Sequence, residues 1–118
     1  MILVVDDDMF ARDIIERTLQ HAGYEIASAR DGREGIDKAS TLTPDLIVLD
    51  LMLPEVDGFG VVRELAKHEH TRTIPIIILT ALDLEPHHRE RLRQPNIVHV
   101  LRKSASVRHD LLHAIAEL

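Results

Sequence analysis

Carboxylates follow two short apolar segments of this 118-residue chain. Asp6 and Asp7 come directly after residues 2–5, and Asp50 comes directly after residues 46–49. Carboxylates held within about 4 Å of each other repel by on the order of 4 kcal/mol per pair at an effective dielectric constant near 20. They therefore need shared protons or a cation. A hard divalent cation such as Mg²⁺ prefers oxygen ligands of this kind.

A hydroxyl and an ammonium group follow two further apolar segments. Thr80 comes directly after residues 75–79, and Lys103 lies just past residues 97–101. A carboxylate beside a bound Mg²⁺ can act as a nucleophile on a phosphoryl donor and form an aspartyl phosphate. Phosphoryl transfer mainly requires positioning and neutralisation of the equatorial oxygens, which Thr80 and Lys103 would assist. The set therefore indicates Mg²⁺-dependent phosphoryl transfer to Asp50.

The elements that must position these residues alternate along the chain. Near-continuous Ile, Leu and Val runs predict buried parallel strands, and apolar residues at helical spacing separate them. The predicted strands are residues 2–5, 24–28, 46–49, 75–79 and 97–101. The predicted helices are residues 11–22, 31–42, 58–68, 85–94 and 107–118, the last with Val107, Leu111, Ile115 and Leu118 on one stripe.

Strict alternation of strand and helix predicts an α/β fold with one open, parallel, five-stranded sheet and right-handed crossovers. Five strands favour the flavodoxin-like doubly wound (βα)5 arrangement, with strand order 2-1-3-4-5. In that order the first and third strands are neighbours, so Asp6, Asp7 and Asp50 would face one crevice outside the carboxyl ends of the strands.

Composition narrows the class of protein. Residues 1–118 are long enough to form one domain with its own core. No apolar run approaches the length of a membrane span, and the net charge of −6 argues against direct binding of nucleic acid by this domain. The chain has no cysteine, which is compatible with the cytoplasm, where we expect it to act. We expect the domain to be a module of a longer protein.

Four motifs, in order and over essentially the full length, resemble those of the receiver domain of two-component response regulators. They are "ILVVDDD", "DLIVLDLMLPEVDG", "IIILTA" and a lysine after the last strand. The resemblance implies phosphorelay signalling: a phosphoryl group from the phosphohistidine of a sensor histidine kinase, or from a phosphotransfer protein, switches the domain and so controls an output domain or effector. Dimerisation through the last two helices is possible. The domain would assist its own phosphorylation without being an enzyme in the usual sense.

The resemblance also implies roles for individual residues. Asp50 resembles the phosphoacceptor, and Thr80 and Lys103 resemble the pair that contacts the phosphoryl oxygens. The implied ligands of the Mg²⁺ cofactor lie in the same two loops. They are Asp7 directly, Asp6 through a metal-bound water, Asp50, and the backbone carbonyl of Met52.

Three places depart from the family pattern. Ser104 and Ala105 stand where receiver domains usually carry a proline, joined to the lysine by a cis bond, and an aromatic residue. Val100 occupies the position of an aromatic residue that swings inward on phosphorylation, and "RQPNIV" lacks the usual Gly-Ala corner. These departures concern the output face, so we expect an intact phosphoacceptor pocket with unusual output coupling.

Simpler interpretations compete with the chemical ones. Asp57 is placed to cap the third helix, and we interpret Asp8 as a charge in the first helical turn instead of a metal ligand. We interpret the eight histidines as solvated, because they form no convincing ligand set, and the arginine-rich residues 89–93 as a solvated helix. A phosphohydrolase using Asp50 is disfavoured because Met52 stands where its second acid would be. A pseudo-receiver that is never phosphorylated remains an alternative.

Overall fold

The computed structural model describes all 118 residues and contains one five-stranded parallel sheet in the order β2-β1-β3-β4-β5. The strands are β1 (Ile2–Val5), β2 (Ile26–Ala29), β3 (Leu46–Leu49), β4 (Ile76–Thr80) and β5 (Ile97–Arg102). The helices are α1 (Met9–His21), α2 (Gly32–Leu42), α3 (Gly58–Leu65), α4 (Pro86–Arg91) and α5 (Val107–Ala116). The predicted fold class and strand order are confirmed.

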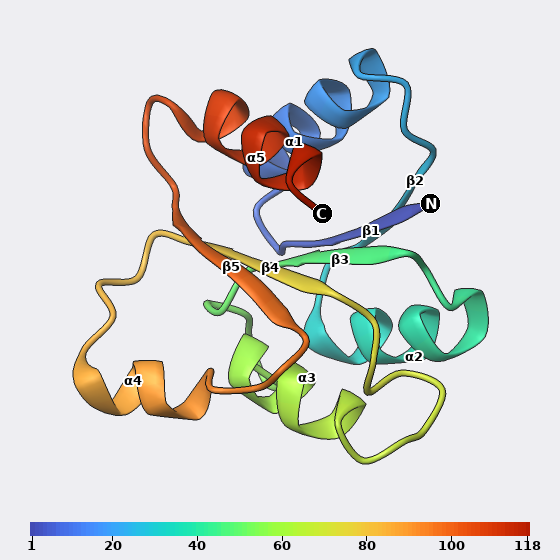
Figure 1. The fold of residues 1–118 in the computed structure, drawn as a ribbon, viewed down its shortest axis with the longest axis vertical. Coiled ribbons are helices and arrows are strands. Elements are labelled where there is room, and N and C mark those ends of the chain that lie inside the picture. The colour runs from blue at the N-terminus through green and yellow to red at the C-terminus, as the bar shows by residue number, and fades with distance from the viewer.

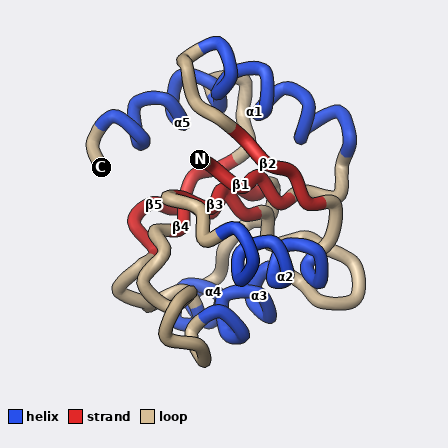
Figure 2. Tube along the Cα trace, turned by 90° about the vertical axis from the view of Figure 1, so that its right-hand side faces the viewer, coloured by secondary structure: helices blue, strands red, loops and turns tan.

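Helices cover both faces of the sheet, α1 and α5 on one side and α2, α3 and α4 on the other (Figures 1 and 2). Successive side chains of a strand point to opposite faces, so β1 contributes to two separate cores. Leu3 and Val5 belong to a cluster of 16 buried residues on the α2–α3 side. Ile2 and Val4 belong to a cluster of 11 buried residues on the α1–α5 side. Burial on both faces explains the nearly continuous apolar strands.

Aspartates fix the first turns of three helices. Asp8 accepts hydrogen bonds from the amides of Phe10 and Ala11 and caps α1, Asp31 caps α2, and Asp57 accepts from the amide of Gly60 at 2.8 Å and caps α3. An N-cap carboxylate satisfies amides that have no partner within the helix. The predicted cap at Asp57 is confirmed, and Asp8 acts as a cap at the start of α1.

Two predicted boundaries differ because local hydrogen bonds hold the chain in another conformation at the ends of α1 and α3. The strand predicted at 24–28 begins at Ile26, since the amide of Tyr24 donates to the Leu19 carbonyl at 3.0 Å and keeps Tyr24 with the end of α1. The helix predicted through residue 68 ends at Leu65, whose carbonyl accepts a hydrogen bond from the buried hydroxyl of Thr71 at 2.7 Å.

The last two helices are shorter than predicted. α4 is a six-residue helix with no buried residue of its own, and the apolar anchor Leu92 follows it. α5 ends at Ala116, and Leu118, predicted on its inner stripe, is 57% exposed. The amide of Leu118 bonds the carbonyl three residues back, at Ile115, which tightens the final turn and turns the side chain away. None of the helices has both the length and the apolar character that crossing a membrane requires.

Strand pairing brings the chemically interesting residues to one edge of the sheet. β1 and β3 are neighbours in register, with Val5 opposite Leu49, so the residues that follow them leave the sheet side by side. The Asp50 amide donates to the Val5 carbonyl at 3.0 Å, and the Lys103 amide donates to the Thr80 carbonyl at 2.8 Å.

Candidate functional site

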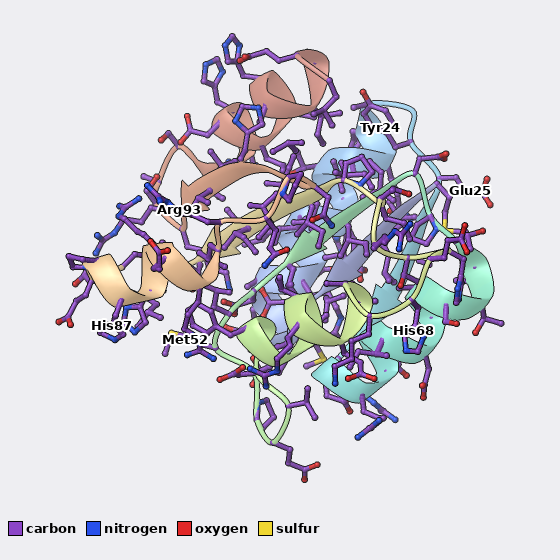
Figure 3. The ribbon with its side chains drawn as sticks, turned by 60° about the horizontal axis from the view of Figure 1, so that its bottom comes forward. Tyr24, Glu25, Met52, His68, His87 and Arg93 are labelled. Carbon is purple, nitrogen blue, oxygen red and sulfur yellow. The ribbon has the colours of Figure 1, made fainter.

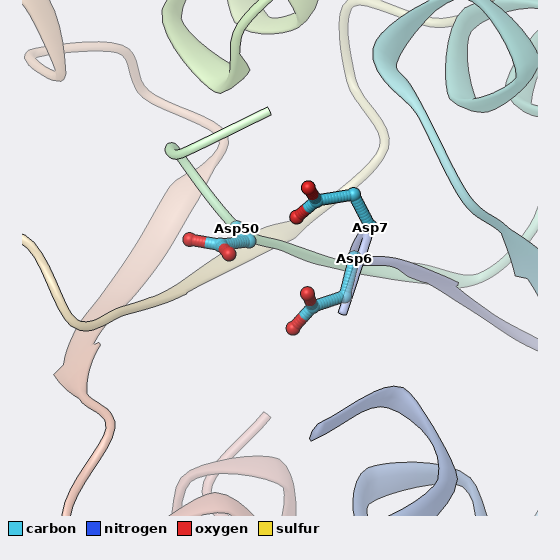
Figure 4. A group of neighbouring side chains, drawn as sticks. All are labelled: Asp6, Asp7 and Asp50. Carbon is cyan, nitrogen blue, oxygen red and sulfur yellow. The ribbon is translucent and has the colours of Figure 1, made fainter. Parts of the chain in front are cut away.

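Three carboxylates converge at the carboxyl ends of β1 and β3. Asp6, Asp7 and Asp50 each offer an oxygen, and these oxygens lie within 4.8 Å of one another (Figure 4). Asp6 and Asp50 are buried, with exposed fractions of 2% and 5%, whereas Asp7 is exposed at the mouth of the cluster. The two acidic loops therefore meet at one edge of the sheet, as the predicted strand order requires.

Lys103 joins the two buried carboxylates. Its Nζ donates to Asp6 Oδ2 at 2.7 Å and to Asp50 Oδ2 at 3.0 Å. Burial raises the pKa of Asp6, and the hydrogen bond and charge of Lys103 offset only part of that rise. Burial alone would lower the pKa of Lys103, but its bonds to Asp6 and Asp50 outweigh this effect and raise that pKa.

Backbone amides hold the remaining oxygens of the cluster in place. Asp6 Oδ1 accepts from the Asp8 amide at 3.0 Å, and Asp50 Oδ1 accepts from the Met52 amide at 3.1 Å. The Thr80 side chain is 1% exposed, and its Oγ1 accepts from the Leu82 amide at 3.1 Å. These bonds fix each side chain from the loop that follows its own strand.

The turn after β3 also contains a backbone carbonyl that can act as a ligand. Met52 follows Asp50 by two residues, its side chain lies at the surface (Figure 3), and its carbonyl oxygen accepts no hydrogen bond from the chain. The turn is closed by hydrogen bonds from the amides of Leu53 and Gly58 to the Leu51 carbonyl, at 3.1 and 3.0 Å. The Met52 carbonyl is therefore free to bind a ligand.

Two residues support the site without being evident as site residues from the sequence. Arg12 of α1 donates from Nη1 to the backbone carbonyl of Asp6 at 2.7 Å and so ties the acidic loop after β1 to α1. A Cβ at Gly58 would lie 2.5 Å from the carbonyl oxygen of Asp50 and 2.5 Å from Leu51 Cα. The Asp-Gly pair at the start of α3 hints at the second contribution, but no motif marks Arg12.

The segment after Lys103 differs from the family pattern as the sequence indicated. The structure has no cis peptide bond, so Lys103 is joined to Ser104 in the trans form. Ser104 instead takes part in a hydrogen-bonded turn: its Oγ lies 3.1 Å from the Oγ of Ser106, and that hydroxyl donates to Asp110 at 2.9 Å. Serine hydroxyls thus organise the entry into α5.

Val100 lies on the outward side of the edge strand β5 and is 39% exposed. Together with Thr80 and Leu82 it lines a small cavity of about 80 Å³ beside the site. The position that the resemblance links to an inward-moving aromatic residue therefore holds a short aliphatic side chain next to Thr80.

The interpretation of all histidines as solvated is wrong for His88. Its ring stacks on Phe59 of α3 with centroids 5.6 Å apart, and its Nδ1 accepts from the Glu85 amide at 3.0 Å. Arg91, expected on a solvated helix, lies 4.2 Å from the centroid of the same Phe59 ring. The short α4 is anchored through these two contacts, which the periodicity of apolar residues does not register.

The comparisons with known proteins agree with this geometry. The family model described as the response regulator receiver domain matches residues 2–116. The chain belongs to the response regulator receiver domain family. It is therefore a signalling domain of the phosphorelay type.

Curated relatives include the DNA-binding dual master transcriptional regulator RpaA of a Synechocystis strain, which is 49% identical over 81 residues, or 69% of this chain and 34% of that protein. The alkaline phosphatase synthesis transcriptional regulatory protein PhoP of Bacillus subtilis is 44% identical over 84 residues, or 71% of this chain and 34% of that protein. The chain thus spans about a third of the length of these relatives.

Solved structures resemble the chain over almost its whole length. Chemotaxis protein CheY4 of Vibrio cholerae superposes with a TM-score of 0.88 at 30% identity, covering 98% of this chain and 95% of that one. The receiver domain of sensor histidine kinase PA1611 from Pseudomonas aeruginosa, described with a magnesium ion in its active site cleft, superposes with a TM-score of 0.86 at 30% identity, covering 98% and 93%.

Proposed function

We propose that this receiver domain accepts a phosphoryl group on Asp50 from the phosphohistidine of a sensor histidine kinase or of a phosphotransfer protein. The observation that carries the proposal is the convergence of three carboxylate oxygens within 4.8 Å, with the Lys103 ammonium bonded to Asp6 and Asp50. Two buried carboxylates against one ammonium leave a negative charge uncompensated, which is costly for folding alone and favours a functional role.

The donor set fits a magnesium ion. All the groups are hard oxygens: Asp7 is exposed and has no cationic partner, Asp6 and Asp50 keep free lone pairs, and the Met52 carbonyl is unbonded. We assign the ligands to Asp7, Asp50 and the Met52 carbonyl, with Asp6 acting through a water. The magnesium described in the active site cleft of the PA1611 receiver domain supports a magnesium site in this domain. When bound, the ion would supply charge neutralisation for the phosphoryl oxygens.

The chain's own residues then act as follows. A carboxylate oxygen of Asp50 attacks phosphorus in line with the phosphorus–nitrogen bond of the donor. That bond breaks, its electron pair stays on the departing imidazole, which takes up a proton, and an acyl phosphate forms on Asp50. Lys103, already 3.0 Å from Asp50 Oδ2, and the Thr80 hydroxyl donate to the phosphoryl oxygens.

Phosphorylation would switch the domain between two states and so regulate an output domain or effector protein. A modification shifts such an equilibrium only by the amount by which it favours one state. The phosphoryl group on Asp50 would add negative charge and acceptor oxygens, which would attract the Thr80 hydroxyl as a hydrogen-bond donor. Thr80 and Val100 line the same small cavity beside the site. The outward face of β5 at Val100 would therefore carry the change to a partner.

We propose the following setting for the domain. Residues 1–118 form the receiver module of a longer protein, and the domain itself contacts proteins and not nucleic acid, in keeping with its net charge of −6. It works in the cytoplasm, where the catalytic part of its kinase would be. A pseudo-receiver without phosphorylation is the alternative, and the divergent segment after Lys103, with Ser104 and Ala105 in place of the usual proline and aromatic residue, is the observation that favours it.

The experiment is intact-mass measurement after incubation with acetyl phosphate, with and without Mg²⁺, on the wild type and on Asp50→Asn. We expect a Mg²⁺-dependent gain of one phosphoryl group that the variant lacks. The matched control is Asp57→Asn, which changes an aspartate in the same loop that serves as a helix cap, and it should label like the wild type. Equal labelling of Asp50→Asn would overturn the assignment, and no labelling of the wild type would favour the pseudo-receiver.

A further inference from the structure

The outer face of α5 carries two imidazoles one helical turn apart. His109 and His113 are four residues apart, and their rings are nearly parallel, with an interplanar angle of 15° and centroids 6.2 Å apart. The inner face of the same helix is formed by Leu111, Ala114 and Ile115, which are buried in the core below α5. The two histidines therefore play no part in holding the helix to the sheet.

A carboxylate completes this histidine pair. Glu117 lies one further turn along the same face, and its Oε1 is 3.0 Å from His113 Nε2. Histidines that bind metals commonly donate their second ring N–H to a carboxylate, which fixes the orientation of the ring and increases the basicity of the ligating nitrogen. Because Glu117 Oε1 lies beside Nε2, Nδ1 is the ring nitrogen of His113 that remains for a metal ion.

We infer that His109 and His113 form a second metal site on α5, which binds a borderline divalent transition-metal ion such as Zn²⁺, with Glu117 orienting His113. Two histidines four residues apart on one helix face form a recurrent chelating pair. Imidazole nitrogens suit Zn²⁺, Cu²⁺ and Ni²⁺, whereas Mg²⁺ selects the oxygen donors of the acidic cluster. The two sites thus differ in ligand chemistry and in their place in the fold.

Both side chains can reach a common ion. His109 and His113 are exposed, the His113 side chain to 72%, so the His109 ring can turn toward an ion at His113 Nδ1 while Glu117 stays beside His113 Nε2. Asp110, the carboxylate beside them, is engaged by the Ser106 hydroxyl at 2.9 Å and does not compete. Ligation would bridge one turn of α5 and stabilise the helix, since a ligand that binds only the folded state adds to its stability.

The test is calorimetric titration of the untagged protein with Zn²⁺ in excess Mg²⁺, which keeps the acidic cluster supplied with its own cation. We expect one Zn²⁺ site in the wild type and its loss in the double variant His109→Gln, His113→Gln. The matched control, His68→Gln with His70→Gln, removes two exposed histidines of a loop, whose rings are tilted by 52°, and should leave the isotherm unchanged. Glu117→Gln should weaken binding by about 10-fold or more.

A measurement on the wild type avoids any dependence on the folding of variants. Imidazole NMR resonances of His109 and His113 should shift on addition of Zn²⁺ and not on addition of Mg²⁺. The inference is overturned if these resonances stay in place, or if the double variant binds Zn²⁺ as the wild type does. Neither result depends on phosphorylation of Asp50, so the failure of one proposal would leave the other standing.

Discussion

Lys103 controls the charge balance of the acidic cluster. It is the cation that contacts both buried carboxylates, and the third carboxylate, on Asp7, remains exposed beside them. One ammonium against three carboxylates leaves a deficit of positive charge when no metal is present. The same side chain that stabilises the metal-free fold is therefore also placed to contact the transferred phosphoryl group.

Replacing Lys103 by Ala should lower the free energy of unfolding in metal-free buffer by about 1–3 kcal/mol, because Asp6 and Asp50 would be left buried and without a cation. Mg²⁺ should stabilise this variant more than the wild type, since the ion would then be the main source of positive charge. Urea unfolding with and without Mg²⁺ measures both effects.

The control for this prediction is Lys67→Ala, which removes a surface partner of Glu64 and should leave stability unchanged within error. Equal stability of Lys103→Ala and the wild type in metal-free buffer would show that the ion pairs with Asp6 and Asp50 do not matter for folding.

The sequence allowed prediction of the residues whose type is unusual for their position. A carboxylate directly after a buried strand, as at Asp6 and Asp50, is conspicuous in the sequence, and the strand order then brings the two together. Arg12 is not conspicuous, because a polar residue on an amphipathic helix is ordinary. Its bond to the Asp6 carbonyl arises only from how α1 packs on the sheet.

At the scale of elements, the turn from β3 into α3 positions the proposed phosphoacceptor through a close approach of two backbone segments. Gly58→Ala should destabilise the domain by about 1–3 kcal/mol and slow labelling of Asp50, because the added methyl group would meet the backbone at Asp50 and Leu51. Thermal unfolding and labelling by acetyl phosphate are the measurements.

Gly60→Ala is the matched substitution on the same helix. The nearest atom to a Cβ there is a side-chain carbon of Val56 at 3.2 Å, and alanine is the better helix former by about 0.5–1 kcal/mol. This variant should therefore label normally and lose no stability. If both variants behave alike, the close approach at Gly58 has no special role.

The attachment of α4 depends on few contacts, and His88 supplies two of them. His88→Ala removes the stacking on Phe59 and the bond to the Glu85 amide, which should lower the local opening free energy of α4 by about 1 kcal/mol and speed amide exchange there roughly fivefold. Hydrogen exchange followed by mass spectrometry resolves the effect.

His87 offers a control one residue away, since it projects outward from α4 (Figure 3) and lacks the stacking on Phe59. His87→Ala should leave exchange in α4 close to that of the wild type. The same exchange rates in both variants would mean that the contacts of His88 do not hold α4 in place.

Element boundaries were less predictable than elements. The start of β2 and the ends of α3 and α5 are set by individual hydrogen bonds, such as that from the Thr71 hydroxyl to the Leu65 carbonyl, which apolar periodicity cannot register. In α1, Ile14 falls at helical spacing with other apolar residues but is 47% exposed, because the packed face centres on Ile15 and Leu19. The spacing of the apolar residues indicated a helix but did not determine which of them face the core.

At the scale of the whole molecule, the site exists only once the sheet has assembled. Lys103 is 97 residues from Asp6 and 53 residues from Asp50 along the chain. An unfolded chain does not bring these groups together, so metal binding should be coupled to folding. The topology could be predicted because every strand and helix followed the same alternating pattern. The side-chain partners could not, because they depend on the packed structure.

This coupling predicts how stability depends on metal. Once Mg²⁺ exceeds its dissociation constant, each further tenfold increase should raise the free energy of unfolding by about 1.4 kcal/mol, as expected for one site that the unfolded chain lacks. Asp7→Asn should weaken the response without unfolding the protein, since Asp7 is exposed. A slope of zero in the wild type would argue against a magnesium site.

Chemical mapping of the modified residue shows whether Asp50 carries the phosphoryl group. Borohydride reduces an acyl phosphate to an alcohol, so the protein would be labelled with acetyl phosphate and Mg²⁺, reduced, digested and sequenced by tandem mass spectrometry. We predict homoserine in place of Asp50 and unchanged Asp6, Asp7 and Asp57. Homoserine at any other aspartate, or none in a protein that has gained a phosphoryl group, would contradict it.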